Sequence, residues 1–215
     1  YEQILSAMLS DLRVRDPAFT ATVESDPAYK ILEVATYRET LLRQRVNEAA
    51  RGVMLAFARG TTLENLGALF DVARLPDETD DRYRIRIHMA LEGFTNAGSE
   101  GAYIFHAMSA STDVKTAAAK MHPTPGHVLV TVLSERNNGV ASPQLLATVE
   151  EAVNGRYIRP LTDMVTVQSA TIIPYQVQAR LYLTSPQLDR GLIREAASKR
   201  CSDYVRTRHN VGQKV

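Results

Sequence analysis

One stretch of the sequence predicts a helix much longer than is usual in a globular protein. Asp26 can accept hydrogen bonds from the free N–H groups at a helix start, and Pro27 suits the first helical position, where no N–H is needed. The helical pattern then continues unbroken to about Ala58. A helix of about 30 residues is roughly 45 Å long, whereas the average helix has about 11 to 12 residues. Such a helix needs partners along its length.

The apolar residues of this predicted helix are spaced by alternating steps of three and four. This is the heptad pattern of a helix that packs along another helix, here with one charged interruption at Glu39. We call these positions the seam and expect a helix-bundle interface there. The seam consists of Leu32, Ala35, Leu42, Val46, Ala49, Val53 and Ala56. The alternative is a long core helix within its own domain, with no role between subunits.

Arginines accompany the seam and occur again further along the chain. Arg43, Arg45 and Arg51 are expected to form a polar rim around an assembly interface, because arginine is suited to carboxylate contacts between partners. The simpler interpretation is a solvated helix face. The three arginines at 82, 84 and 86 are expected to lie on solvated helix faces.

The remainder of the first half also has helical spacing, and the second half does not. Shorter helices are expected at about 4–16, 61–70, 79–92 and 99–111, so that residues 1–111 form a helical region. A strand is expected at 114–120, a turn at 123–126, a second strand at 126–134, a helix from Ser142 and a returning strand from Met164 to Gln168.

A further strand and helix are indicated after this unit. Apolar and polar residues alternate from Tyr175 to Leu183, and the letters Ser-Pro-Gln-Leu at 142–145 recur at 185–188 before another amphipathic stretch. The predicted fold class is therefore α+β, with a helical region at 1–111 that contains the long helix at about 27–58. A first α/β unit is expected at 112–170 and a second, incomplete one at 171–215. Because the sequence begins without Met and ends at Val215, we expect a piece of a longer polypeptide.

Composition and motifs indicate neither catalysis nor a bound cofactor or metal. The 215 residues carry a formal charge of +1, which provides no overall field for nucleic acid. No apolar stretch reaches the roughly 18 residues that span a bilayer. The five histidines lack a metal-binding spacing, and the single Cys201 has no identifiable base. The acidic run 77–81 lacks the spacing of a calcium loop, and its position at a helix start explains it.

Several stretches, in order, resemble the baseplate J-like proteins of contractile phage tails and R-type tailocins. The stretches that carry the resemblance are Ser25 to Glu39, Leu42 to Arg51, Leu63 to Val72, Ser99 to Tyr103, Pro125 to Val128 and Arg159 to Val167. The pattern departs at the end, because family members are expected to continue with a helix and a strand that complete the last α/β unit.

The resemblance implies a structural protein and no catalysis. It implies a baseplate wedge component, present in several copies around the tail axis, that joins neighbouring wedges into a ring and helps couple receptor engagement to sheath contraction. The implied partners are other wedge proteins, the sheath-initiator and hub region, and copies of the chain itself. The implied location is the virion or tailocin particle, after assembly in the bacterial cytoplasm. The alternatives are a monomeric ligand-binding or regulatory α+β module and, more remotely, a hydrolase.

Overall fold

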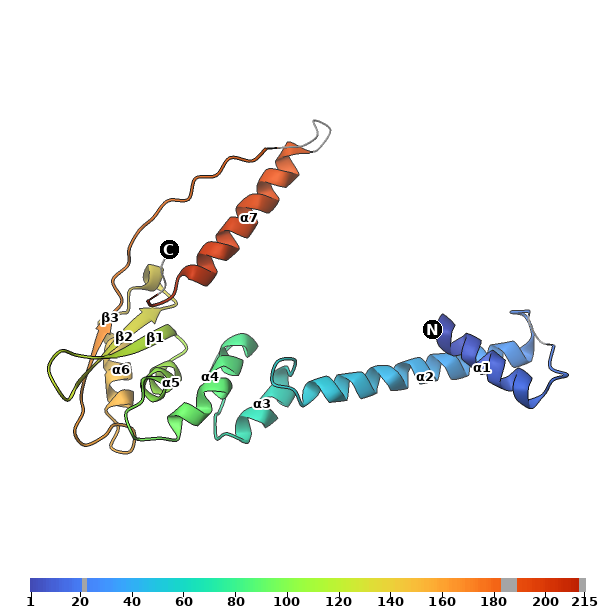
Figure 1. Ribbon diagram of the computed structural model, residues 1–215, viewed down its shortest axis with the longest axis horizontal. Helices are drawn as coiled ribbons and strands as arrows, with labels where there is room; N and C mark the ends of the chain where they lie inside the picture. Colours follow the sequence, from blue (N-terminus) through green and yellow to red (C-terminus); the bar gives the residue numbers. More distant parts are fainter. Residues whose placement is uncertain (21–22, 183–188, 213–215) are drawn as a thin grey trace. The chain divides into compact units, whose positions relative to one another are not determined.

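The computed structural model describes residues 1–20, 23–182 and 189–212. The chain divides into two compact units, Tyr1–Leu66 and Gly67–Val215. The first unit is helical, and the second combines helices with a sheet of three strands (Figure 1). The α+β class is thereby confirmed. Helices α4 (Asp80–Gly93) and α5 (Glu100–Ala110), which fall within the predicted helical region 1–111, belong to the compact unit that contains the sheet.

The first unit consists of α1 (Glu2–Arg15), α2 (Pro27–Gly52) and the start of α3 (Gly60–Ala68). The Asp26 side chain accepts a hydrogen bond from the Ala28 N–H at 2.8 Å, and Pro27 opens α2, as expected from the sequence. Helix α1 packs on the first half of α2 (Figure 1). There Thr36 is completely buried, and its hydroxyl lies 3.4 Å from the Met8 sulfur.

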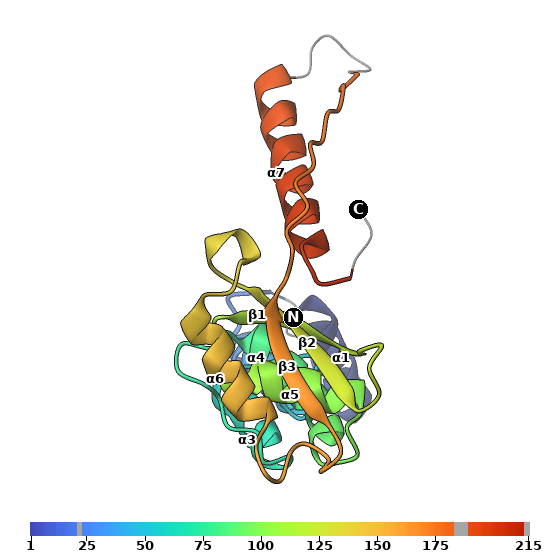
Figure 2. The same cartoon turned by 90° about the vertical axis from the view of Figure 1, so that its left-hand side faces the viewer.

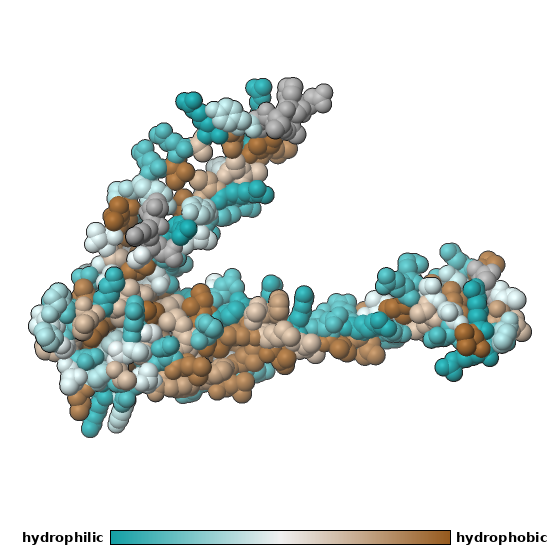
Figure 3. All heavy atoms as spheres, viewed as in Figure 1, coloured by the Kyte–Doolittle hydropathy of each residue, from teal (hydrophilic) through white to brown (hydrophobic). Residues whose placement is uncertain are grey.

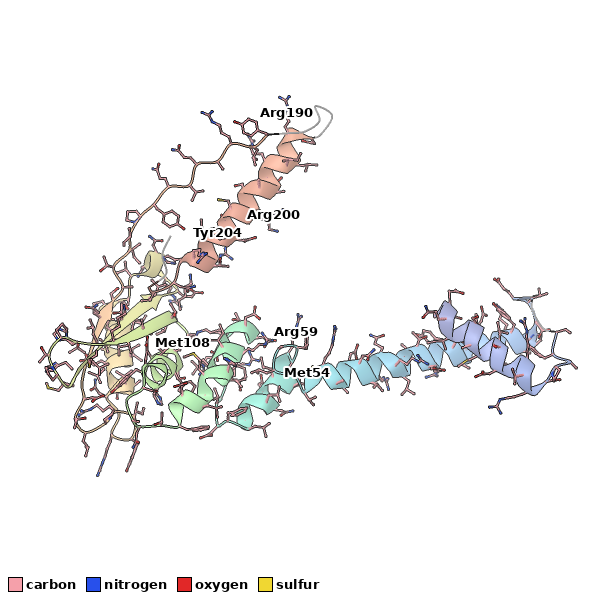
Figure 4. The ribbon with its side chains drawn as sticks, in the orientation of Figure 1. Met54, Arg59, Met108, Arg190, Arg200 and Tyr204 are labelled. Carbon is pink, nitrogen blue, oxygen red and sulfur yellow. The ribbon has the colours of Figure 1, made fainter. Side chains whose placement is uncertain are left out.

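The long helix ends at Gly52 and not at about Ala58 as the periodicity suggested. Residues 53–57 form turns, in which the N–H groups of Phe57 and Ala58 both donate to the Met54 carbonyl. Glycine weakens a helix by about 1 kcal/mol relative to alanine, so Gly52 is a weak point in the helix. Met54 and Arg59 lie in the connection between α2 and α3 (Figure 4). Two predicted seam residues, Val53 and Ala56, therefore fall outside the helix.

The second unit is built around the sheet. Helices α4 (Asp80–Gly93) and α5 (Glu100–Ala110) lead into β1 (Val114–Met121) and β2 (His127–Ser134), followed by the 3-10 turn η1 (Asn137–Gly139), α6 (Pro143–Val153) and β3 (Met164–Ser169). The strand order is β1-β2-β3, with β1 antiparallel and β3 parallel to β2. Both predicted strands of the hairpin, the helix after Ser142 and the returning strand are confirmed.

The core of this unit lies between one face of the sheet and two helices. Helices α5 and α6 lie on the same face of the strands (Figure 2). Val130 and Val132 of β2 are fully buried and belong to the same apolar cluster as Val149 and Val153 of α6. Successive side chains of a strand point to opposite faces of the sheet, so every second side chain lies in the core. The β2–α6–β3 crossover covers this face of the sheet.

A hydrogen bond from the buried Tyr103 ties α5 to the loop before β3. The Tyr103 hydroxyl donates to Asp163 Oδ2 at 2.7 Å. Burial and the Asp163 carboxylate raise the pKa of Tyr103 above its ordinary value of 10.0. The phenol therefore stays neutral and continues to donate when exposed tyrosines ionise.

The Tyr103→Phe variant is expected to lose about 1 kcal/mol of unfolding free energy at neutral pH, because Asp163 loses its buried donor. The unfolded chain ionises Tyr103 above about pH 10, whereas the folded protein resists ionisation. The unfolding free energy of the wild type therefore falls relative to that of the variant as the pH rises beyond that point. Urea unfolding of both proteins at about pH 8 and about pH 11 measures this. A difference in unfolding free energy between the two proteins that stays constant or widens at the higher pH would contradict this prediction.

Buried charges at the start of α4 were missed by the sequence analysis. The Glu78 side chain is fully buried and forms ion pairs with Arg82 and Arg86, the latter with Arg86 Nε 3.1 Å from Glu78 Oε1. Arg82 Nη2 also donates to the carbonyls of Met108 and Ser111, each at 2.6 Å. The expectation of solvated arginines is thus wrong for Arg82 and Arg86, and burial lowers the pKa of Arg86.

The third arginine of this group is half-buried, and the rest of the acidic run lies around the start of α4 as expected. Arg84 pairs with the exposed Asp81 at 2.7 Å, and Thr79 caps α4 by accepting from the Arg82 N–H. The acidic run therefore contains helix-start residues, as predicted, together with one carboxylate that belongs to the interior.

The strand predicted from Tyr175 to Leu183 is not formed in residues 170–182, and Leu183 lies outside the described residues. No backbone hydrogen bond joins residues 171–182 to another described residue. Alternation predicts an extended segment with two faces, but a strand also requires a hydrogen-bonded neighbour. The repeated letters at 185–188 also lie outside the described residues. Helix α7 (Arg190–Arg208) follows, with Asp189 as its N-cap.

Candidate assembly surface on helix α2

The seam is exposed along the second half of α2. Leu42 is 62% exposed and Val46 60% exposed, and every residue from Leu42 to Arg51 is exposed. Hydrophobic surface lies along one side of α2 next to hydrophilic side chains (Figure 3). Burial of one such aliphatic side chain stabilises an interface by about 1.5–3 kcal/mol, so this face has the chemistry of a docking surface.

A shallow groove marks the place where α1 stops covering α2. It is lined by residues of both helices, and the seam passes through it. The lining residues are Met8, Ala35, Arg38, Glu39, Leu42, Arg43, Val46 and Asn47.

The structure places the predicted seam residues in three different environments. Leu32 and Ala35 are half-buried in the part of α2 that faces α1. Leu42, Val46 and Ala49 are exposed on the helix, whereas Val53 and Ala56 are exposed in the turns that follow it. A continuous apolar face for a partner helix is therefore provided by Leu42, Val46 and Ala49.

The three predicted rim arginines also differ from one another. Arg43 Nη2 lies 2.5 Å from Glu39 Oε1, so its charge is already paired one turn away along the helix. Arg45 is exposed next to the seam. Arg51 lies nine residues from Leu42, which at 100° per residue places it on the opposite side of the helix. Its guanidinium is 5.3 Å from the centre of the Phe57 ring.

Arg38 is a candidate site residue that the sequence analysis did not include. It lines the groove and precedes Arg45 by seven residues, so both arginines flank the same side of the seam. The heptad spacing itself could have revealed it. Among the described residues, neither Arg38 nor Arg45 forms an ion pair.

The titratable groups elsewhere do not assemble into a recognisable reaction centre in the described part of the chain. No group of three histidine, cysteine, aspartate or glutamate side chains that could hold a metal ion occurs there. His122 and His127 approach across the hairpin turn with ring centroids 6.0 Å apart, which provides two ligands at most. Burial lowers the pKa of His106, which keeps its ring neutral on α5. Cys201 on α7 is a free thiol.

Comparison with known proteins identifies the family of the chain that carries this surface. The model of the baseplate J-like N-terminal domain matches residues 24–79, and that of the baseplate J-like central domain matches residues 95–169. Baseplate protein J of Escherichia phage P2 is 45% identical over 213 residues, which cover 92% of this chain and 70% of the relative. The chain belongs to the baseplate J-like family. The resemblance inferred from the sequence is thereby confirmed.

The two family matches follow the architecture closely. The N-terminal match contains all of α2 and α3, and the central match runs from just before α5 to the end of β3. The candidate assembly surface of this baseplate J-like protein thus lies within the N-terminal family domain. Together, the matches place the protein among the structural proteins of phage tail baseplates. No helix in the described residues is both long and apolar enough to span a membrane.

Proposed function

We propose that this baseplate J-like protein is a wedge component of a contractile tail and that it joins neighbouring wedges into a ring around the tail hub. In this role the face of Leu42, Val46 and Ala49 docks helices of other baseplate proteins, and the ring transmits the contraction trigger to the sheath. The observation that carries the proposal is the apolar heptad face left open along the second half of α2 in a member of this family.

The architecture supports this role in a second way. The sheet unit has a dense apolar core and a buried ion cluster, so it can serve as a rigid body. In the first unit, by contrast, the apolar face of Leu42 and Val46 remains exposed. A rigid body joined to an open docking helix suits a connector between subunits, including one whose contacts rearrange on contraction.

The proposal is tested by expression of the full-length protein together with the products of its neighbouring genes. Electron microscopy should show wedge-shaped complexes or rings that are absent when the protein is omitted. In those complexes, the amides of residues 42–51 should gain protection from hydrogen exchange relative to the free protein. A stable monomer with this segment already protected, and with no complex formed, would favour the alternative of a monomeric ligand-binding or regulatory module.

A further inference from the structure

We propose that one end of the sheet holds a copper ion, Cu(I), between His122, His127 and Met164. The site lies in the sheet unit, away from the residues of the docking face on α2, and does not depend on the proposed function. Its three side chains come from the ends of neighbouring strands, and Met164 lies far along the chain from the two histidines. The spacing of the histidines in the sequence therefore does not reveal the site.

The strand register places these three residues in one row. The His122 N–H donates to the His127 carbonyl at 2.9 Å, so the two histidines are opposite each other at the turn of the β1–β2 hairpin. His127 is in turn the register partner of Met164, the first residue of β3, and β2 and β3 run side by side (Figure 2). Paired residues of neighbouring strands, about 4.8 Å apart, point to the same face of a sheet. The row therefore presents two imidazoles and a thioether on one face.

This face of the sheet is the one opposite α5 and α6. Val128 and Val165, the next residues along β2 and β3, pack into the core, so His127 and Met164 point away from it. Met164 is 61% exposed, His122 is exposed and His127 is half-buried. An ion can thus reach all three side chains from solvent.

The two histidine rings have the separation that a shared ion requires. Their centroids are 6.0 Å apart. Two imidazoles that bind one ion through nitrogens at about 2.1 Å place their centroids roughly 4.5–6.5 Å apart, depending on the angle at the ion. His122 Nδ1 accepts the Thr124 N–H at 3.2 Å, which leaves Nε2 for the ion. Binding through Nε2 requires the ring proton on Nδ1, so it breaks the bond with Thr124.

The set of ligands favours copper over the other common transition metals. Imidazole binds copper, zinc and nickel, whereas a thioether is a soft ligand that selects Cu(I). Histidine, cysteine and acidic side chains form no group of three in the described part of the chain, so Zn²⁺ has only the histidine pair here. The unbranched Met164 side chain has three rotatable bonds with which its sulfur can turn toward that pair. A copper ion bound in this way ties the tip of the hairpin to the start of β3.

The test is a titration of the full chain with Cu(I) in the absence of oxygen, in competition with the chromophoric chelator bicinchoninate. The parent protein and all variants carry Cys201→Ser, because the free thiol is itself a Cu(I) ligand. The parent should bind one Cu(I) per chain. His122→Ala and His127→Ala should each bind about tenfold or more weakly, because each removes a ligand. His88→Ala, at an exposed histidine of α4, should bind as the parent does.

Two methionine variants test the thioether. Met164→Leu should weaken Cu(I) binding by about tenfold and leave the binding of Zn²⁺ to the histidine pair unchanged. Met121→Leu is the matched control, because Met121 is 84% exposed at the end of the same hairpin but pairs with Val128 and so lies on the opposite face of the sheet. X-ray absorption at the copper edge should detect one sulfur ligand in the parent and none in Met164→Leu. The amide signal of Thr124 should shift when Cu(I) is added to the parent.

Three outcomes would overturn the proposal. Failure of the parent protein to bind Cu(I), or equally tight binding by His122→Ala and His127→Ala, removes the site altogether. Weaker binding by both histidine variants together with unchanged binding by Met164→Leu removes the thioether from the site, and with it the selection of copper. Circular dichroism of each variant verifies that the fold is retained.

Discussion

The Glu78→Gln variant is expected to lose about 3–5 kcal/mol of unfolding free energy, because Arg82 and Arg86 keep their charges in the interior after their shared carboxylate is gone. The Glu78 side chain is fully buried, and its Oε2 also accepts the Leu75 N–H at 3.0 Å. The cluster joins the turn before α4 to the end of α5 and the start of β1, since Arg82 donates to the carbonyls of Met108, Ser111 and Val114. The loss should therefore affect the whole sheet unit.

Urea unfolding followed by circular dichroism measures this loss. The matched control is Asp81→Asn, three residues away, whose carboxylate pairs with Arg84 at 2.7 Å and is 95% exposed. An exposed pair contributes about 0–1 kcal/mol, so the control should unfold almost as the wild type does. A Glu78→Gln variant as stable as Asp81→Asn would show that the buried cluster contributes little.

The Val46→Asp variant is expected to block assembly with the neighbouring baseplate proteins while the isolated protein keeps its stability. Val46 is 60% exposed in the free chain, so an aspartate there remains hydrated and costs little, about 0.5 kcal/mol or less. In an assembled helix bundle, the same carboxylate would be buried in an apolar seam without a partner, which costs several kcal/mol. Size-exclusion chromatography and electron microscopy of the co-expressed proteins measure the assembly.

A second aspartate variant separates the position from the charge. Gln44→Asp adds the same charge two residues away, on the side of α2 opposite the seam. It should assemble normally, with a small loss of helix stability because Gln44 donates to Glu48 at 2.8 Å. Normal assembly of Val46→Asp, or equal defects in both variants, would mean that the seam is not the docking face.

Most helix starts could be predicted because their signals are local. Asp26, Thr79, Ser99 and Ser142 each accept a hydrogen bond from an N–H two or three residues further along the chain. Such bonds require only neighbouring residues, so the sequence displays both partners. The β-branched run in β2 and the hairpin turn before it were recognisable for the same reason.

The candidate site could be predicted only in part. The heptad spacing indicated an apolar face on α2, but it could not show that α1 covers the first half and leaves Leu42 and Val46 exposed. Nor could it show that Glu39 compensates Arg43 while Arg38 and Arg45 form no ion pair among the described residues. These distinctions depend on packing and on side-chain rotamers.

The sequence by itself determined the helix starts, the strand positions of the β1–β2 hairpin and β3, the α+β class and the family. The tertiary structure decided which charges are buried, as with Glu78 and Arg86, and which apolar residues stay exposed, as with Val46. The physical reason is distance along the chain. A cap or a turn is satisfied within a few residues, whereas Arg82 finds its carbonyl acceptors 26 to 32 residues away, where only the folded chain brings them together.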